Sequence, residues 1–309
     1  MSRPILLPWR TTLCFCAAFL ATAPLRAAEV RIQVVPLVVP LAGDWDGNGI
    51  TDLGWFHGTF EDAFFFGIDP LAENFLGTSF DCGRLPLSGG GWMPFAGDWD
   101  GNGQHEIGVF HPATREYVLF RHEPGTGDWV EHRRFFHPVT GQGGVPVAGD
   151  WNGDRKDEVG LYLDDEKRFQ LLAIDEDQAV VRHDLTFQGL PDASSWRPVA
   201  GHWGGDGGGV DTLALWNPVT RDLVYRTQNT SGPPQDWPFE IDDEDPAGPL
   251  PFAGNWGYSV SIGFYDPDGA GTGEALFVLY PWDFFSSDLG GEPILLPPPE
   301  DPLVTPCVQ

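Results

Sequence analysis

Three short segments of the chain carry oxygen-bearing side chains at the same relative positions, numbered 1, 3, 5 and 9 within each segment. Alternate residues of a tightly curled loop point inward, and a carbonyl at position 7 supplies another oxygen. All-oxygen ligation by a flexible loop favours calcium over zinc, which prefers Cys or His, and over magnesium, which keeps more water. The sequence therefore predicts up to three calcium sites, with the ligands Asp44, Asp46, Asn48, Ile50 and Asp52; Asp98, Asp100, Asn102, Gln104 and Glu106; and Asp150, Asn152, Asp154, Lys156 and Glu158.

Two other interpretations of these loops are weaker. An EF-hand needs a bidentate Glu at position 12, where this chain has Trp55, Val109 and Leu161. A metal-free acidic turn is disfavoured because carboxylates packed together without a cation repel one another. A glycine after position 5 would tolerate a positive φ, and Arg155 replaces it in the third loop, so we expect that loop to be the weakest site.

The loops follow a repeated phrase, Pro-x-Ala-Gly-[Asp/His/Asn]-Trp, which occurs five times. Its glycines, Gly43, Gly97, Gly149, Gly201 and Gly254, are spaced by 54, 52, 52 and 53 residues. Such a period indicates one repeated supersecondary unit that cannot bury its own apolar face. The last two copies lack the regular carboxylate pattern, so calcium is not expected in every unit.

Each unit reads as four short β-rich segments separated by turn residues, which is the size of a β-propeller blade. We therefore predict an all-β fold, a β-propeller with five recognisable four-stranded blades, although diverged blades would escape this count. The segment Val30–Val35 is expected to close the ring by completing the last unit, and the repeated Trp residues are expected to pack between blades. The predicted ranges are 1–28 for a signal peptide, 29–292 for the propeller with repeats near 40–93, 94–145, 146–197, 198–250 and 251–292, and 293–309 for a Pro-rich tail.

The first residues have the order of a secretory signal peptide. Arg3 and Arg10 precede an apolar run, and the small residues Ala27 and Ala28 follow it. Secretion by a cleaved signal is therefore predicted, without membrane insertion of the remaining chain. That chain would retain Cys82 and Cys307, an even pair that either forms a disulfide in an oxidising compartment or remains two unrelated thiols.

Charge and motif content narrow the function classes. The 309 residues carry 17 Lys+Arg against 45 Asp+Glu, a formal charge of −28, which argues against nucleic-acid binding and against docking on anionic lipid. No nucleophile elbow, metalloprotease helix or phosphate-binding glycine loop is present in the sequence. We therefore expect no enzymatic activity.

The calcium-loop pattern, followed by [Leu/Ile/Val]-Gly-x-[Phe/Tyr], resembles the FG-GAP (VCBS-type) repeats of integrin α-subunit propellers and of many secreted proteins. The resemblance covers residues 36–290 and implies a propeller with calcium in its loops and a role in recognising a protein or a sugar. The number of blades differs from that family, because integrin-like propellers have seven blades and five units are recognisable here.

The expected function is a secreted, calcium-binding, non-catalytic recognition or scaffold module for a protein partner. A propeller lectin that binds a glycan is the alternative, and a hydrolase with a site in the central channel is a more remote one. A lectin should repeat polar and aromatic residues outside the shared phrase. Segments such as Asp62–Phe66 and Glu116–Phe120 share apolar pattern but little polar identity, which favours the scaffold.

Overall fold

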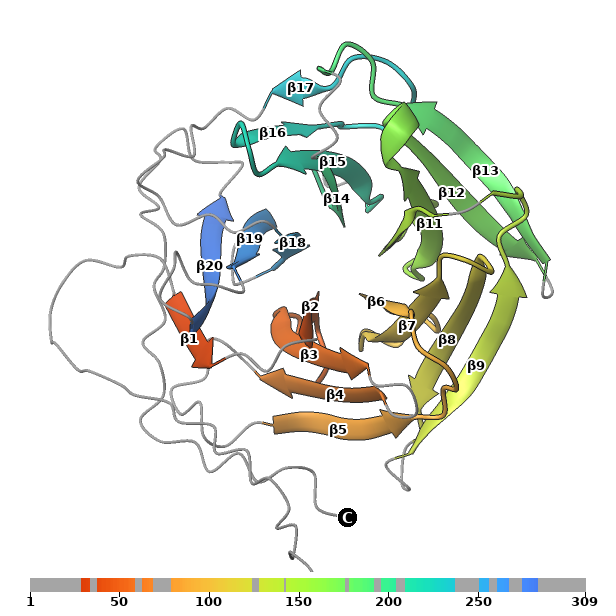
Figure 1. Cartoon of the computed structure of the whole chain (residues 1–309), viewed down its shortest axis with the longest axis vertical. Helices are drawn as coiled ribbons and strands as arrows, with labels where there is room; N and C mark the ends of the chain where they lie inside the picture. Colours follow the sequence, from red (N-terminus) through yellow and green to blue (C-terminus); the bar gives the residue numbers. More distant parts are fainter. Residues whose placement is uncertain are drawn as a thin grey trace, which may run out of the picture.

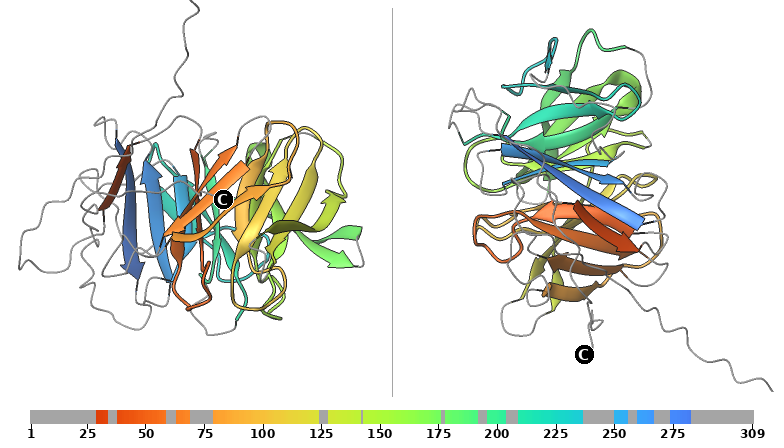
Figure 2. Two further views of the ribbon diagram at one scale, coloured as in Figure 1. Left: turned by 90° about the horizontal axis from the view of Figure 1, so that it is seen from below. Right: turned by 90° about the vertical axis from the view of Figure 1, so that its left-hand side faces the viewer.

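The computed structural model describes most of the region predicted to form the propeller. The described residues are 29–33, 38–58, 63–68, 79–123, 128–141, 143–175, 178–191, 196–203, 209–236, 250–255, 260–266 and 274–282. They form five four-stranded antiparallel sheets arranged around a central space (Figure 1), and the strands run between the two faces of the ring (Figure 2). The prediction of an all-β propeller is therefore confirmed, and the described residues give five blades.

In the first three blades the strands pair in sequence order, from the inner edge to the outer edge. Blade 1 contains β2 (Val38–Gly43), β3 (Asp52–Gly58), β4 (Ala63–Ile68) and β5 (Ser79–Leu85). Blade 2 contains β6 (Met93–Gly97), β7 (Glu106–His111), β8 (Glu116–His122) and β9 (Trp129–Phe136). Blade 3 contains β10 (Val145–Gly149), β11 (Glu158–Leu163), the short helix η1 (Asp164–Glu166), β12 (Arg168–Asp175) and β13 (Gln178–Thr186).

The last two blades differ in how they end. Blade 4 contains β14 (Arg197–Gly201), β15 (Thr212–Asn217), β16 (Asp222–Tyr225) and the two-residue β17 (Gln235–Asp236). Blade 5 takes β18 (Leu250–Gly254), β19 (Val260–Asp266) and β20 (Glu274–Trp282) from the end of the chain and β1 (Glu29–Gln33) from its beginning. The predicted closure of the ring by the N-terminal strand is thus confirmed, because β1 pairs antiparallel with β20.

The repeated proline marks the innermost strand of each blade. Proline has no N–H to donate, so within a sheet it is confined to edge strands. Each of these prolines lies on a strand that pairs with one neighbour only, for example Pro40 opposite Trp55 and Pro94 opposite Val109. The five inner strands β2, β6, β10, β14 and β18 therefore present one unpaired edge each to the centre of the ring.

The Gly and Trp of the repeated phrase form one packing unit. A Cβ on Gly97 would lie 2.5 Å from the ring of Trp99, so only glycine fits beneath the indole. Trp99 is 6% exposed and packs with Val159 and Leu161 of blade 3. Trp45, Trp151 and Trp203 pack in the same way against the following blade, which confirms the predicted packing role for these four residues.

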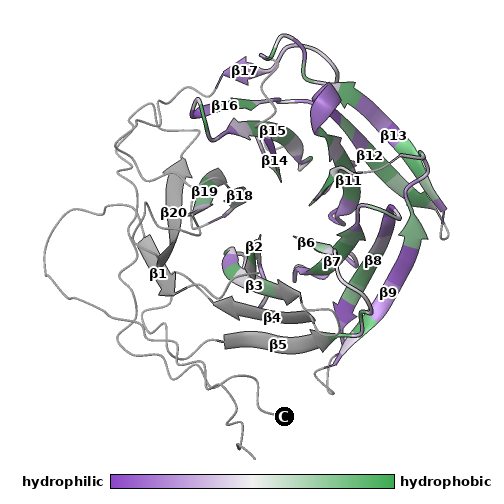
Figure 3. Ribbon diagram, viewed as in Figure 1, coloured by the Kyte–Doolittle hydropathy of each residue, from purple (hydrophilic) through white to green (hydrophobic). Residues whose placement is uncertain are grey.

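The second strand of each blade lies deepest in the core. All six residues of β15 and five of the six in β7 are buried, because neighbouring blades cover both faces of these strands. The outer strand β13 instead alternates exposed and half-buried residues, and its hydrophilic segments are visible in Figure 3. The predicted signal peptide, the C-terminal tail, Cys307 and the side chain of Cys82 lie outside what the structure describes, so these predictions remain predictions.

Candidate metal centres in the blade loops

The three predicted loops connect the inner strand to the second strand of blades 1, 2 and 3. The position 9 carboxylate is the first residue of the second strand in each case, Asp52 in β3, Glu106 in β7 and Glu158 in β11. The strand thereby fixes one potential ligand while the loop carries the others.

The position 1 aspartate organises the first loop from within. The Oδ1 atom of Asp44 accepts the N–H groups of Gly47 at 2.8 Å and of Asn48 at 3.0 Å, and its Oδ2 atom accepts the N–H of Gly49 at 2.7 Å. Three backbone donors thus converge on one carboxylate and curl the chain around it. Gly47 and Gly49 have φ of 75° and 85°, a region that favours glycine.

The second loop repeats this construction. Asp98 accepts the N–H groups of Gly101 at 2.7 Å, Asn102 at 3.1 Å and Gly103 at 2.8 Å. The position 7 residues Ile50 and Gln104 donate their N–H groups, each at 2.7 Å, to the position 5 side chains of their loops. The local sequence therefore specifies the same loop twice.

The position 9 carboxylate closes each loop onto the repeated Trp. Asp52 Oδ2 accepts the N–H of Trp45 at 3.0 Å, and Glu106 Oε2 accepts the N–H of Trp99 at 3.1 Å. Asp52 is 0% exposed and Glu106 is 4% exposed. Each of these two loops thus has two buried carboxylates, at positions 1 and 9, and one exposed carboxylate at position 3.

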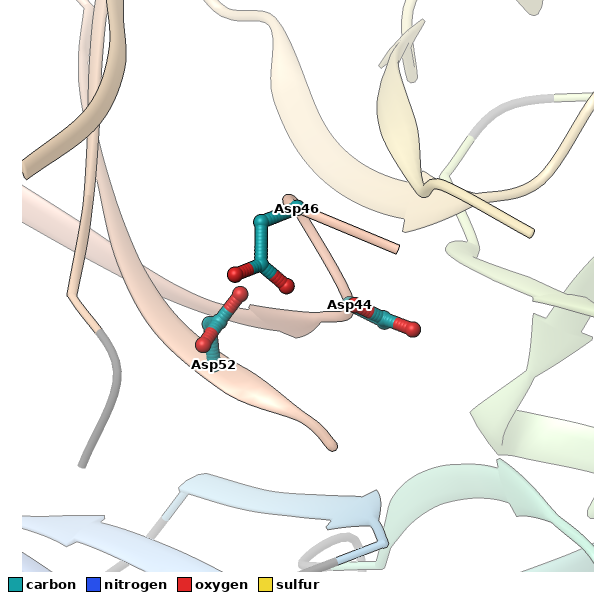
Figure 4. A group of neighbouring side chains, drawn as sticks. All are labelled: Asp44, Asp46 and Asp52. Atoms are coloured by element: carbon teal, nitrogen blue, oxygen red, sulfur yellow. The ribbon is translucent and has the colours of Figure 1, made fainter. Parts of the chain in front are cut away.

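The carboxylates converge in blades 1 and 2. In the group Asp44, Asp46 and Asp52, one ligand atom from each residue lies within 4.8 Å of the others, and Figure 4 shows the Asp46 and Asp52 carboxylates facing one another. In blade 2 the second such group brings together Asp98, Asp100 and Glu106. Oxygen donors at this spacing suit a calcium ion.

The carboxylates of the third loop have a different hydrogen-bond partner. The side-chain amide of Asn152, at position 3, donates to Asp154 Oδ2 at 3.0 Å and to Glu158 Oε1. An N–H donor therefore lies between two carboxylates, where the first two loops have the carboxylate of Asp46 or Asp100. Within the described residues, the third loop does not form a carboxylate group like those of blades 1 and 2.

The third loop also carries backbone strain. Arg155 has φ of 70° at the position where Gly49 and Gly103 have 85° and 91°. Its N–H still donates to Asp150 Oδ2 at 2.8 Å, so the loop keeps the shape of the others without a glycine. A non-glycine residue in this region is disfavoured.

Burial and mutual repulsion raise the pKa of several carboxyls in these loops. Burial, followed by the charges of Asp100 and Asp98, raises the pKa of Glu106 to about 8. Burial also raises the pKa of Asp44, with a smaller contribution from Asp46. Glu158 in the third loop has its pKa raised to about 7 by burial and by Asp154 and Asp150. A bound cation would oppose these shifts by stabilising the ionised forms.

Position 8 carries a function that the sequence analysis missed. Asp157, from the loop of blade 3, donates its N–H to the carbonyl of Asp98 in blade 2 at 2.8 Å and accepts the N–H of Asp98 on Oδ2 at 2.8 Å. Asp211 forms the same pair of bonds with Asp150, at 2.8 and 3.0 Å. We call this reciprocal pair the inter-blade clasp.

The clasp also joins the end of the ring to its beginning. Thr51 of blade 1 donates its N–H to the carbonyl of Asn255 in blade 5 at 2.7 Å, and its Oγ1 accepts the N–H of Asn255 at 2.7 Å. At the remaining described junction, His105 donates its N–H to the carbonyl of Asp44 at 2.7 Å. Position 8 is Thr, His or Asp in different blades, so residue identity alone gives no sign of a shared role.

Two cavities adjoin these loops. The central cavity, of about 420 Å³, is lined by the five inner strands and by the residues that directly precede the second strands of blades 1 to 4, namely Thr51, His105, Asp157 and Asp211. A second cavity, of about 300 Å³, lies between blades 1 and 2 beside the second loop. Within the described ranges, no helix has the length and apolar character needed to cross a membrane.

No protein-family model and no curated protein matches this chain, so the resemblance to FG-GAP repeats remains a prediction. Similar solved structures include two variants of exo-β-1,3-galactanase from Phanerochaete chrysosporium, each with β-1,3-galactotriose. Both are 10% identical to this chain; one match covers 94% of this chain and 67% of the galactanase at a TM-score of 0.42, the other 89% and 63% at 0.43. This is a likeness of fold and assigns no activity.

The comparison nevertheless corrects two expectations. The predicted non-catalytic scaffold for a protein partner, and the expected lack of enzymatic activity, are contradicted because the similar propellers are galactan-processing enzymes. The prediction relied on the lack of contiguous catalytic motifs. A propeller brings residues from separate blades to one cavity, so a reactive site in this fold need not leave a local motif in the sequence.

Proposed function

We propose that the chain is a calcium-binding β-propeller that holds one ion in the loop of blade 1 and one in the loop of blade 2. The observation that carries the proposal is the convergence of three carboxylates, with ligand atoms within 4.8 Å of one another, in each of these loops. Asp44, Asp46 and Asp52 would hold the first ion, and Asp98, Asp100 and Glu106 the second. The residues fit calcium because every donor is an oxygen.

A bound ion would stabilise the folded ring. The loops link the inner strand to the second strand of each blade, and position 1 of each loop is hydrogen-bonded to the next blade. Calcium binds the folded loops and not the extended chain, so it stabilises the native state by mass action. We therefore expect calcium to raise the thermal midpoint.

Native mass spectrometry with thermal denaturation tests the proposal. The wild-type chain should bind two calcium ions, and EDTA should lower its Tm. Asp46→Asn and Asp100→Asn should each remove one ion, because each replaces an anionic ligand of its group. Asp154→Asn is the matched control in the third loop and should leave the ion count at two. A chain that binds no calcium and melts at the same temperature with EDTA contradicts the proposal.

The cavity beside the second loop favours a glycan as the ligand class of this propeller. Trp45 and Trp129 line it and are 5% and 6% exposed, so they lie at its base. Arg121 and Glu123, joined by a 2.7 Å hydrogen bond, and Asp100 add donors and acceptors of both signs. Such a mixture suits neutral hydroxyl groups above an aromatic base better than a ligand of one charge.

Incubation with a panel of oligosaccharides that includes β-1,3-galactotriose, followed by mass spectrometry, tests this second proposal. The readout covers both bound and cleaved sugars, so it does not assume a lectin or an enzyme. Arg121→Ala should reduce the signal, whereas Arg182→Ala, on the exposed strand β13, should not. Neither complex nor product with any sugar, or equal effects of the two variants, would overturn it.

A further inference from the structure

We propose that Asp157, which belongs to blade 3, is a positioning residue for the cation site of blade 2. This inference rests on the proposed calcium site formed by Asp98, Asp100 and Glu106. Asp157 lies outside that group, in the next loop along the chain, and it acts on the site through the main chain of Asp98.

Two hydrogen bonds to Asp157 hold the main-chain N–H and the main-chain carbonyl of Asp98. The N–H of Asp98 donates to Asp157 Oδ2 at 2.8 Å, and the carbonyl of Asp98 accepts the N–H of Asp157 at 2.8 Å. The contact is also close, because a Cβ placed on Gly97 would lie 3.1 Å from the Cβ of Asp157. The backbone immediately before and at position 1 therefore has little freedom to move relative to blade 3.

Position 1 is the residue whose displacement would disturb the site most. The carboxylate of Asp98 accepts three backbone N–H groups of the loop and also contributes to the carboxylate group. If its main chain shifts, the loop curl and the ligand oxygen shift together. Residues that orient metal ligands in this way commonly change metal affinity by about 10–100-fold when they are replaced.

The other junctions provide internal comparisons. Between blades 1 and 2 only the backbone half of the clasp is present: His105 donates its N–H to Asp44, and its Nδ1 atom has no hydrogen-bond partner. Between blades 3 and 4 Asp211 makes the complete clasp to Asp150 of the third loop, where no cation is proposed. The same side-chain interaction thus occurs once beside a proposed site and once away from one.

Isothermal titration with calcium tests the role of Asp157. The titrations use the Asp46→Asn background, in which the blade 2 site is the one that remains. Asp157→Ala should weaken calcium binding by about 10–100-fold. Asp211→Ala, the matched control, removes the same kind of hydrogen bond from the third loop and should lower Tm without changing calcium affinity.

Two further variants place at residue 157 the residue types that other blades carry at position 8. They test the same role if Asp157→Ala does not fold. Asp157→His introduces the half clasp of the blade 1–2 junction and should weaken binding in the same way. Asp157→Thr introduces the hydroxyl acceptor that Thr51 uses towards Asn255 and should restore affinity to within a few-fold of the parent.

Equal calcium affinity in the parent and in Asp157→Ala or Asp157→His would overturn the positioning role. An equal loss of affinity in Asp211→Ala would also overturn it, because the effect would then be general destabilisation of the ring. Neither result bears on the two ions expected in the wild-type chain. Failure of the proposed calcium sites would instead appear as a wild-type chain that binds no calcium.

Discussion

The loops of blades 1 and 2 differ from the loop of blade 3 in the order of the residues at positions 3 and 5 and in the glycine that they carry at position 6. The first two carry Asp at position 3 and Asn at position 5, and the third carries Asn152 and then Asp154. Position 3 faces the carboxylate at position 9, so an Asp there adds negative charge and an Asn there adds a donor. At these two positions the three loops have the same composition, and we propose that the order determines whether a cation or an amide neutralises the carboxylate at position 9.

We expect the largest effect from pH, through the buried Glu106 in the proposed calcium site of blade 2. Glu106 has an ordinary pKa of 4.5 in the unfolded chain and about 8 in the folded, calcium-free chain. Calcium-free stability should therefore fall as pH rises through this window, because the unfolded chain ionises first. Calcium binds the ionised form, so its affinity for blade 2 should rise about tenfold per pH unit from about pH 5 to 8.

Melting curves with calcium and with EDTA from pH 5 to 8 measure this effect. The gain in Tm from calcium should grow with pH. Glu158 in the third loop has its pKa raised to about 7, and its contribution should remain the same with or without calcium. Glu106→Gln should make the calcium effect smaller and nearly independent of pH. A wild-type calcium effect that is flat over this range would show that Glu106 does not ligate the ion.

The next largest effect is expected when the third loop is given the residue order of the first two. Asn152→Asp removes the amide that donates to Asp154 and Glu158. Without calcium, the variant should lose about 1–3 kcal/mol of unfolding free energy, because the half-buried Glu158 carboxylate loses its donor and faces a second negative charge. With calcium, it should bind a third ion by native mass spectrometry.

The reciprocal exchange in blade 2 is the matched control. The double variant Asp100→Asn with Asn102→Asp reproduces the residue order of blade 3 and should lose one ion. If both chains still bind two ions, residue order does not explain the difference between the loops.

The smallest effect concerns the backbone of the third loop. Arg155 has φ of 70°, which costs a non-glycine residue about 1–2 kcal/mol. Arg155→Gly should stabilise the chain by about 0.5 kcal/mol, because glycine's greater freedom in the unfolded state offsets part of this gain, about 0.5–1 kcal/mol. Urea denaturation measures the change.

Gly103→Ala probes the equivalent position in blade 2. A Cβ on Gly103 would meet no atom within 4 Å, so the substitution introduces backbone strain without a clash. It should destabilise the chain by about 1 kcal/mol. Effects of the same sign for Arg155→Gly and Gly103→Ala would contradict the strain interpretation.

Much of the architecture follows from the repeated phrase. Proline excludes the phrase from the middle of a sheet, and glycine is required beneath the Trp ring, so the phrase predicts an inner edge strand followed by a packed turn. The ligand spacing likewise predicts which residues of blades 1 and 2 converge. These features are local, and a single copy of the repeat contains the information for them.

The rest depends on contacts between copies. The clasp joins residues about sixty positions apart, such as Asp98 with Asp157, and it uses backbone atoms for half of its bonds. Different side chains at position 8 serve the same contact, so a comparison of the repeats does not reveal it. The ligand pattern also accepts either Asp or Asn as an oxygen ligand. It therefore does not show that the side-chain amide of Asn152 donates to Glu158.

We propose that the loops of blades 1 and 2 bind calcium, whereas the Asn152 amide neutralises the loop of blade 3. Anomalous X-ray diffraction from crystals grown with calcium distinguishes the two kinds of loop. We predict one peak in blade 1 and one in blade 2, each with carboxylate oxygens about 2.3–2.6 Å away, and no peak in the loop of blade 3. No peak in blades 1 and 2, or an equal peak between Asn152 and Glu158, would contradict this difference between the loops.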